Sequence, residues 1–343
     1  MKFIPFKVGR SLAIDLGTAN TLLSIKGRGI AVREPSVVAI DKYNRKVLAI
    51  GNDADEMLGR TPENISAIRP VKEGVIADID ITEAMIRRLI HVALGKRGTV
   101  FKPRITVCVP TGITNVEKRA AVQALMLAGA KSVTLIEEPI AAALGAGLDI
   151  LKPEGNMIVD IGGGTCETAV IALGGVVASR SMRLAGTALN ESIINYVKKH
   201  YGLAIGDKTA EEIKISIGSA SPFDGEGTYE VRGRDSSTGL PKNISVSASE
   251  VREAMAEHIN AIIEEVRNTL SITPAELTAD ILKNGITLTG GGALIRNLDK
   301  VMESAIGVPV KVANEPLDCV VLGTGLASEN ENILHRSGVA RNG

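Results

Sequence analysis

One motif occurs twice in this sequence, and its two copies lie far apart. Ala13-Ile-Asp-Leu-Gly-Thr-Ala-Asn near the start returns as Val159-Asp-Ile-Gly-Gly-Gly-Thr in the second half of the chain. In each copy an aspartate, Asp15 or Asp160, ends a short apolar run that predicts a strand, and a glycine turn and another strand follow. Solenoids repeat a unit of about 20–50 residues several times. A single large repeat instead predicts two similar halves that face each other across a cleft.

The rest of the chain alternates short β-branched runs with amphipathic helical stretches, which predicts an α/β fold. A chain of 343 residues exceeds what one hydrophobic core usually organises, so two domains are expected. Two helices begin at the capping boxes Ser247-x-x-Glu250 and Thr114-x-x-Glu117, and a third is expected over 189–201. The polar stretch 222–238 is typical of a loop or hairpin on a peripheral subdomain. The predicted strands are Leu12–Asp15, Leu22–Ile25, Ile105–Val109, Met157–Asp160, Ala169–Ala172 and Ile286–Thr289.

Composition argues against several functions. The 39 Lys and Arg residues balance 39 Asp and Glu residues, so the chain lacks the positive field that holds proteins on nucleic acid, and nucleic acid is not an expected partner. The sequence has no apolar run of about 20 residues and no secretory leader, and its three cysteines are widely spaced. These features predict a cytoplasmic protein. The four scattered histidines form no zinc-binding pattern.

Each copy of the repeated motif has the composition of a phosphate-binding turn. Glycines leave backbone N–H groups open to phosphate oxygens, and two such turns can grip one polyphosphate. Asp15 and Asp160 then lie on either side of it, where carboxylate oxygens hold Mg²⁺ through its waters. Either copy taken alone is equally well explained as an ordinary β-turn with a turn-stabilising aspartate. A third cluster, Leu288-Thr-Gly-Gly-Gly-Ala-Leu, follows a strand and is expected to open a helix that contacts a nucleotide's sugar, base or α-phosphate.

The chain contains neither Gly-x-x-x-x-Gly-Lys-Ser/Thr nor Gly-x-Gly-x-x-Gly, so its nucleotide site differs from those of P-loop and Rossmann proteins. It resembles the actin superfamily of ATPases, and within it the MreB/Mbl family of bacterial cell-shape proteins. The glycine hairpins recur in actins, sugar kinases and heat-shock chaperone ATPases, whereas Thr-Ala-Asn-Thr and Glu-Glu-Pro are more specific to this family. Further matching segments are Arg33-Glu-Pro-Ser-Val-Val-Ala, Ala67-Ile-Arg-Pro, Gly74-Val-Ile-Ala-Asp, Ile136-Glu-Glu-Pro-Ile-Ala-Ala-Ala, Ser237-Thr-Gly-Leu-Pro and Glu315-Pro-Leu-Asp-Cys-Val.

The resemblance implies an actin-like fold in which two similar halves, each a larger α/β core with a smaller subdomain, surround a central ATP cleft. Four subdomains are expected. Subdomain IA is implied at 1–37, 72–145 and 318–343, IB at 38–71, IIA at 146–185 and 250–317, and IIB at 186–249.

The resemblance also implies the residues of the site. Glu138 matches the acid that orients a water in line with the γ-phosphorus, and Thr165 matches the residue that helps to hold this water; such chemistry is mostly positioning and charge stabilisation. Glu137 is expected to face solvent at a strand end. The implied nucleotide-binding residues are Gly17, Thr18, Ala19 and Asn20 in the first loop, Gly162, Gly163, Gly164 and Thr165 in the second, Glu211, Glu212, Ile213 and Lys214 in the segment over adenine and ribose, and Gly290, Gly291, Gly292 and Ala293 in the adenosine loop.

The function that the resemblance implies is that of a slow ATPase. Its ATP-dependent, Mg²⁺-dependent filaments lie on the inner face of the cytoplasmic membrane and organise cell-wall synthesis to maintain rod shape. The implied partners are further copies of the chain and RodZ-like and MreC-like proteins. Cys166 and the pair Thr187-Ala188 depart from the family pattern near the pocket, so affinity or turnover is expected to differ from that of other members.

Two alternatives use the same fold. A small-molecule kinase needs an aspartate base for a substrate hydroxyl, and Asp224 is the residue to consider. It lies in a polar loop with no substrate motif around it, and the Glu-Glu-Pro segment argues against this function. A heat-shock-type chaperone is not expected, because it needs a peptide-binding domain beyond about residue 328.

Three of the four phenylalanines lie in two short basic segments, Met1-Lys-Phe-Ile-Pro-Phe-Lys-Val and Gly98-Thr-Val-Phe-Lys-Pro-Arg. Between Glu83 and Glu117 the chain carries several Lys and Arg residues and no acid. Apolar tips on a cationic face suit an anionic lipid surface. The alternative is that Phe3 and Phe6 pack the amino terminus onto the sheet and the basic residues form a solvated helix face. The candidate membrane residues are Phe3, Ile4, Phe6, Val100 and Phe101.

Overall fold

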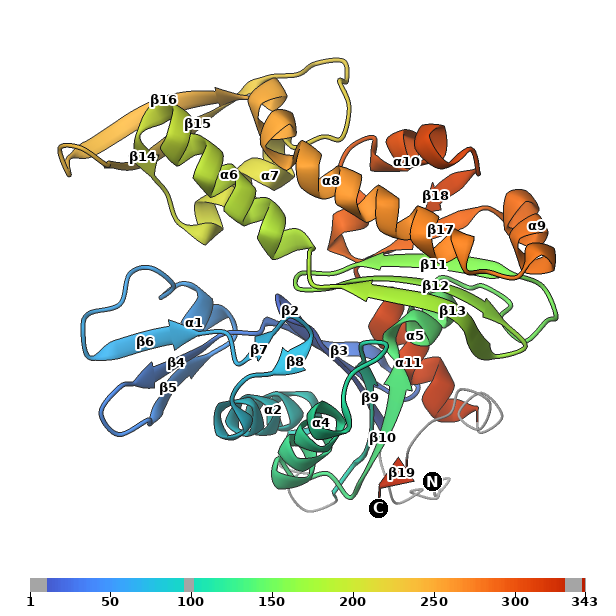
Figure 1. The fold of residues 1–343 in the computed structure, drawn as a ribbon. Helices are drawn as coiled ribbons and strands as arrows, with labels where there is room; N and C mark the ends of the chain where they lie inside the picture. Colours follow the sequence, from blue (N-terminus) through green and yellow to red (C-terminus); the bar gives the residue numbers. More distant parts are fainter. Residues whose placement is uncertain (1–10, 96–101, 331–340, 343) are drawn as a thin grey trace, which may run out of the picture. The chain divides into compact units, whose positions relative to one another are not determined.

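The structure is a computed structural model that describes residues 11–95, 102–330 and 341–342 (Figure 1). Its contacts divide the chain into two units. The first comprises Met1–Lys152, Leu173–Val176 and Asp318–Gly343, and the second comprises Pro153–Ala172 and Val177–Leu317. The second unit is therefore inserted into the chain of the first.

The first unit is built on a six-stranded sheet of order β19-β10-β9-β1-β2-β3. β1 runs antiparallel to β2 and parallel to β9, and β9 runs parallel to β10. β1 and β2 are buried along almost their whole length, which is typical of strands covered on both faces. The strands are β1 (Ser11–Leu16), β2 (Asn20–Ile25), β3 (Gly29–Pro35), β9 (Arg104–Val109), β10 (Ser132–Glu137) and β19 (Arg341–Asn342).

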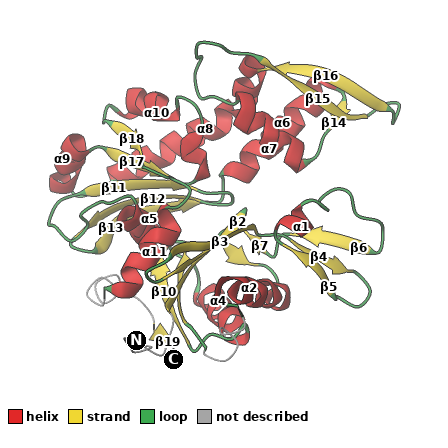
Figure 2. Ribbon diagram, turned by 180° about the vertical axis from the view of Figure 1, so that it is seen from behind, coloured by secondary structure: helices red, strands yellow, loops and turns green. Residues whose placement is uncertain are grey.

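Helices cover both faces of this sheet (Figures 1 and 2). α2 (Ile79–Leu94) and α4 (Asn115–Leu127) pack together on one face, and α5 (Glu138–Gly145) and α11 (Cys319–Glu329) pack together on the other. Their apolar stripes bury the core, with Met85 and Ile86 of α2 wholly enclosed. The smaller elements of this unit are β4 (Val38–Asp41), β5 (Val47–Ile50), α1 (Asn52–Asp55), β6 (Ile65–Ile68), β7 (Val71–Lys72) and β8 (Val75–Ile76).

The second unit repeats this architecture. Its main sheet has the order β13-β12-β11-β17-β18, in which β11 is antiparallel to β12 and parallel to β17, and β17 is parallel to β18. The order matches β3-β2-β1-β9-β10 strand for strand, which confirms the prediction of two similar halves. The strands are β11 (Asn156–Ile161), β12 (Cys166–Ala172), β13 (Gly175–Met182), β17 (Ile286–Thr289) and β18 (Val310–Val312).

The helices of the second unit surround a separate core. The long helix α8 contacts β12, α6, α7 and α10, and its residues Val251, Met255, Ile259, Ile262 and Val266 are buried as predicted (Figure 1). A three-stranded sheet contains the hairpin β15–β16. The elements are α6 (Gly186–Tyr201), β14 (Leu203–Ala204), α7 (Asp207–Ile217), β15 (Thr228–Asp235), β16 (Pro241–Ser247), α8 (Ala248–Ser271), α9 (Ala275–Asn284), the 3₁₀ turn η1 (Gly291–Leu294) and α10 (Leu298–Ile306).

The six predicted strands and both capping-box helices are confirmed, with Thr114 and Ser247 as the N-caps of α4 and α8. The third helix begins at Gly186, three residues earlier than predicted, because the N–H groups of Gly186 and Thr187 find backbone acceptors in the second glycine hairpin. The expectation of a helix after the third glycine cluster is wrong in detail. The cluster itself forms only the four-residue 3₁₀ turn η1, because glycines are poor helix formers, and α10 begins later, after Asn297 in a left-handed conformation (φ 60°).

Among the described residues, no helix combines the length and the apolar character needed to cross a bilayer. The finer division into four subdomains stays a prediction.

Candidate functional site

The first hairpin joins β1 to β2 in the first unit. Asp15 lies near the end of β1 and pairs with Leu22, and Gly17, Thr18 and Ala19 form the turn. A Cβ built on Gly17 would lie 2.7 Å from the carbonyl oxygen of Asn20. The turn is therefore too tight for any residue other than glycine at this position.

Residues from three later segments form hydrogen bonds with this hairpin. The Ser36 hydroxyl donates to the Gly17 carbonyl (2.6 Å), the Arg69 guanidinium donates to the Ala19 carbonyl (3.2 Å), and the Gly74 N–H donates to the Thr18 hydroxyl (3.1 Å). Sequence reasoning assigned none of the three a role. The only signal was that each lies in a segment that matched the family, and these contacts show what those segments do.

An acidic cluster forms where β1, β9 and β10 end. Glu138 is the first residue of α5 and is only 8 % exposed. Ligand atoms of Asp15, Cys108 and Glu138 all lie within 4.8 Å of one another. Burial, and then the charges of Asp15 and Glu138, raise the pKa of the Cys108 thiol well above its usual range. Sequence reasoning missed Cys108, whose Sγ lies 3.6 Å from Asp15 Oδ1.

Glu137, the neighbour of Glu138, is half-buried and does not lie fully in solvent as expected. Burial raises the pKa of its carboxyl, and the charge of Lys118 partly offsets this effect.

The second hairpin joins β11 to β12 in the second unit. The Gly162 N–H donates to the Thr165 carbonyl (2.9 Å), which closes the turn, and Thr165 is buried. Asp160 is also buried and accepts a hydrogen bond from the Thr289 hydroxyl (2.8 Å). Burial raises the pKa of Asp160 to about 6, and the bond from Thr289 opposes this shift. Cys166, a departure from the family pattern, is fully buried one residue after the turn.

The start of α6 holds the second hairpin in place. Gly186 N–H donates to the Gly162 carbonyl (3.0 Å) and Thr187 N–H donates to the Gly163 carbonyl (2.8 Å). The Thr187-Ala188 departure thus lies against the phosphate loop, where the contact of Thr187 is made by the backbone.

Of the four nucleotide-binding residues predicted on α7, two lie near the first residue of α6. The Lys214 ammonium donates to the Gly186 carbonyl (3.0 Å) and to Glu211 Oε2 (2.9 Å). Ile213 instead lies in the core, and Glu212 accepts a bond from the Tyr229 hydroxyl (3.4 Å). Glu211 and Lys214 are therefore near the second hairpin, whereas Glu212 and Ile213 point elsewhere.

The third glycine cluster packs on the end of β11. Gly290 has φ 76°, and a Cβ built on it would lie 2.4 Å from the Ile161 carbonyl oxygen and 2.9 Å from Asp160 Oδ1. Gly290 to Ala293 thus directly adjoin the strand that carries Asp160.

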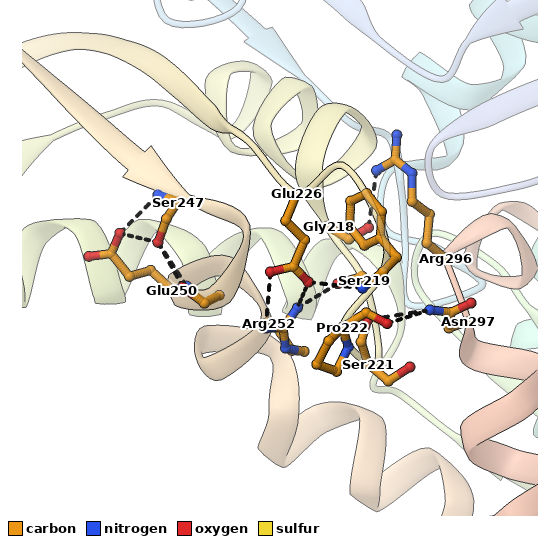
Figure 3. A network of polar contacts seen from close by, with 12 residues as sticks. Gly218, Ser219, Ser221, Pro222, Glu226, Ser247, Glu250, Arg252, Arg296 and Asn297 are labelled. Atoms are coloured by element: carbon orange, nitrogen blue, oxygen red, sulfur yellow. Dashed lines mark hydrogen bonds and ion pairs between the residues drawn. The ribbon is translucent and has the colours of Figure 1, made fainter.

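The residues after this cluster are tied to the end of α7 (Figure 3). The Arg296 guanidinium donates to the Gly218 carbonyl (3.3 Å) and lies 5.1 Å from the centre of the Phe223 ring. The Arg296 carbonyl accepts from the Ala220 N–H (2.8 Å). The segment that carries Glu211 and Lys214 is therefore joined to the segment that carries Gly290 to Ala293.

Two further residues complete this network (Figure 3). Asn297 Nδ2 donates to the Pro222 carbonyl (3.1 Å). Arg252, from α8, pairs with Glu226 and donates to the Ser219 hydroxyl (3.1 Å). The hydrogen bond from Arg252 lowers the pKa of the Glu226 carboxyl. The sequence carried no signal for these contacts, because the partners lie on separate elements.

The donors suit a hard cation. Each unit carries one aspartate near the end of an equivalent strand, Asp15 or Asp160, and carboxylate oxygens are ligands that Mg²⁺ prefers, whereas the soft Cys108 thiol beside Asp15 is not. The candidate membrane residues Phe3, Ile4, Phe6, Val100 and Phe101 lie outside the described residues. Asp224 is exposed in the loop between α7 and β15.

Two sheets of the same topology, each with an aspartate and a glycine hairpin at equivalent strand ends, define an actin-like protein. A solved double helical filament of MamK shares this fold with a TM-score of 0.80 at 21% identity, covering 94% of this chain and 99% of that one.

The family follows from closer similarities. The MreB/Mbl protein family model matches residues 9–336. The cell shape-determining protein MreB of Escherichia coli (strain K12) is 50% identical over 322 residues, which cover 93% of each chain. The crystal structure of MreB5 of Spiroplasma citri bound to ADP has a TM-score of 0.90 and 37% identity, covering 94% of this chain and 97% of that one. The chain belongs to the MreB/Mbl family.

Proposed function

We propose that this chain is an ATP-dependent, filament-forming bacterial actin. Its polymers lie on the inner face of the cytoplasmic membrane, organise cell-wall synthesis and maintain rod shape. The observation that carries the proposal is the pair of aspartate–glycine hairpins on two sheets of matching topology. The ADP bound by the similar MreB5 protein and the role printed in the name of the E. coli relative support it.

The two hairpins bind the phosphates of one ATP, each from its own unit. The bare backbone of Gly17 to Asn20 and of Gly162 to Thr165 donates to phosphate oxygens, while Gly290 to Ala293 and the Glu211–Lys214 pair hold the adenosine. Asp15 and Asp160 would hold Mg²⁺ through its waters. The cation, when bound, neutralises charge on the phosphates. The four subdomains outlined from the sequence belong to the same proposal.

Hydrolysis depends on a water aligned with the γ-phosphorus. Glu138 accepts a hydrogen bond from this water and orients it, and Thr165 holds it from the second unit. Buried carboxylates are suited to this task because few solvent molecules compete for them, and Glu138 is buried at the start of α5. Turnover is slow and coupled to polymer dynamics.

Membrane contact is assigned to Phe3, Ile4, Phe6, Val100 and Phe101. The partners are further copies of the chain and RodZ-like and MreC-like proteins of the cell-wall machinery.

Sedimentation with anionic liposomes and Mg²⁺·ATP tests the proposal, with phosphate release followed in the same tubes. We expect ATP-dependent pelleting that Phe101→Ala weakens, with Leu173→Ala, an exposed leucine in a turn, as the matched control. A monomer that stays in the supernatant and releases phosphate only with small hydroxylated substrates would refute the filament and favour a kinase.

A further inference from the structure

Asn190 is a buried polar residue of α6 that no motif singled out. It is 3% exposed, and its Nδ2 donates two hydrogen bonds to α7. One goes to Asp207 Oδ1 (3.0 Å), in the first turn of α7, and the other to Glu211 Oε2 (2.8 Å), one turn later. A single amide group thus links α6 to two carboxylates of the helix proposed to contact the adenosine.

The orientation of this amide is set by charge. Only the NH₂ end can face two carboxylates, since the opposite orientation would direct Oδ1 at two anions. Among the described residues, Asn190 Oδ1 has no hydrogen-bond partner. A buried acceptor without a partner reduces stability, so Asn190 keeps its two donated bonds at a cost to the fold.

The two hydrogen bonds that the Glu211 carboxylate accepts within the described part of the chain both go to the same oxygen, Oε2. Its Oε2 accepts from Asn190 and from Lys214 (2.9 Å), and within the described part of the chain no hydrogen bond uses Oε1. The Glu211 side chain is 44% exposed, whereas that of Lys214 is 10% exposed. The two internal donors fix the carboxylate and leave its second oxygen as an acceptor toward solvent. Lys214 also donates to Gly186, next to the second hairpin.

We propose that Asn190 is a positioning residue that holds Glu211 so that Oε1 accepts a hydrogen bond from the 2′-hydroxyl of the nucleotide's ribose. This inference rests on the proposed function. A carboxylate oxygen accepts only, so its partner on the ligand is a hydroxyl or an amino group, and the 2′- and 3′-hydroxyls are the strongest donors of the sugar. On this proposal Asn190 favours binding of ribonucleotides over 2′-deoxyribonucleotides without touching the ligand.

The test compares Asn190→Leu with Asn195→Leu, the same change at an exposed position of the same helix. Isothermal titration measures the affinity of the full chain for Mg²⁺·ATP and Mg²⁺·2′-deoxy-ATP, and phosphate release is measured at saturating ATP. We expect Asn190→Leu to weaken ATP binding roughly ten-fold, and 2′-deoxy-ATP binding much less, with maximal turnover retained. Asn195→Leu should match the wild type.

A double-mutant cycle with Glu211→Gln shows whether Asn190 acts through Glu211. Adding Asn190→Leu to Glu211→Gln should cause little further loss. Equal losses for both nucleotides, additivity in the cycle, or wild-type binding by Asn190→Leu would each overturn the assignment. If Asn190→Leu does not fold, Asn190→Ser replaces it, and the same outcomes decide. A wild-type chain that binds no ATP would overturn the proposed function and the inference together, whereas normal binding without these effects overturns the inference alone.

Discussion

The two glutamates at the end of β10 differ in burial although they are adjacent. Glu138 is buried beside Asp15 and Cys108, whereas Glu137 is half-buried toward Lys118. Glu138→Gln keeps the shape of the side chain but removes the charge that orients water, so we expect ATP turnover to fall by about 100-fold or more with binding retained. Glu137→Gln is the matched control and should change turnover little. Similar losses of ATP turnover in both variants would contradict the assignment of Glu138 as the residue that orients water.

Asp160 gives the nucleotide-free protein an unusual pH dependence. Its pKa is raised by burial to about 6, above its usual value of 3.8. The folded state therefore holds a proton that the unfolded state releases between about pH 4 and pH 6, so this group's contribution to stability falls as pH rises through that window. The loss is on the order of 3 kcal/mol.

Chemical denaturation of the wild type and Asp160→Asn, both in EDTA, measures this effect. The variant should be about as stable as the wild type at pH 4 and more stable at pH 7, because the amide stays neutral. A constant difference between the two proteins across this range would contradict the assignment.

At the level of elements, the third glycine cluster allows a direct comparison of neighbouring positions. A Cβ at Gly290 would meet the Ile161 carbonyl at 2.4 Å and adopt a left-handed φ, whereas one at Gly291 meets only a methyl of Leu317 at 3.4 Å. We expect Gly290→Ala to reduce the free energy of unfolding by roughly 3 kcal/mol, from backbone strain and overpacking. Gly291→Ala should change it little. Thermal unfolding of both variants tests this, and equal stabilities would show that β11 yields to the added methyl.

The strands, the capping boxes and the repeated hairpins were predictable because their signals are local. Apolar runs before Asp15 and Asp160, and Ser247 three residues before Glu250, are read within a few positions of the sequence. The family resemblance added Glu138, but its burial depends on packing among separate strands.

The residues that hold the site in place through hydrogen bonds could not be predicted from the sequence, because each lies far in the chain from the residue that it contacts. The Ser36 hydroxyl that holds Gly17, and the Arg296 guanidinium that holds Gly218, belong to elements brought together only by the fold. No spacing in the sequence encodes such a pair. The 3₁₀ turn after Gly290 was missed because the cluster was expected to open a helix, whereas its glycines have low helix propensity and its backbone packs closely on Ile161.

At the scale of the whole molecule, each unit has its own core and one hairpin. The nucleotide proposed to bind the two hairpins should stabilise the folded chain by mass action. At 100 times its Kd, Mg²⁺·ATP should contribute about 2.7 kcal/mol, or an increase in Tm of roughly 4 °C for a chain of this length. Differential scanning calorimetry with Mg²⁺·ATP and with ATP in EDTA measures this. An unchanged Tm at every Mg²⁺·ATP concentration would contradict the proposed site.

The insertion of one unit into the other also sets an order of events during translation. Once Leu317 has left the ribosome, the second unit is complete, but the first still lacks α11, which covers β1 and β9, and β19, which pairs with β10. A nascent chain can therefore fold its second unit while one face of the main sheet of the first unit is still uncovered. The portion of this protein that is synthesised first is therefore the last to be finished.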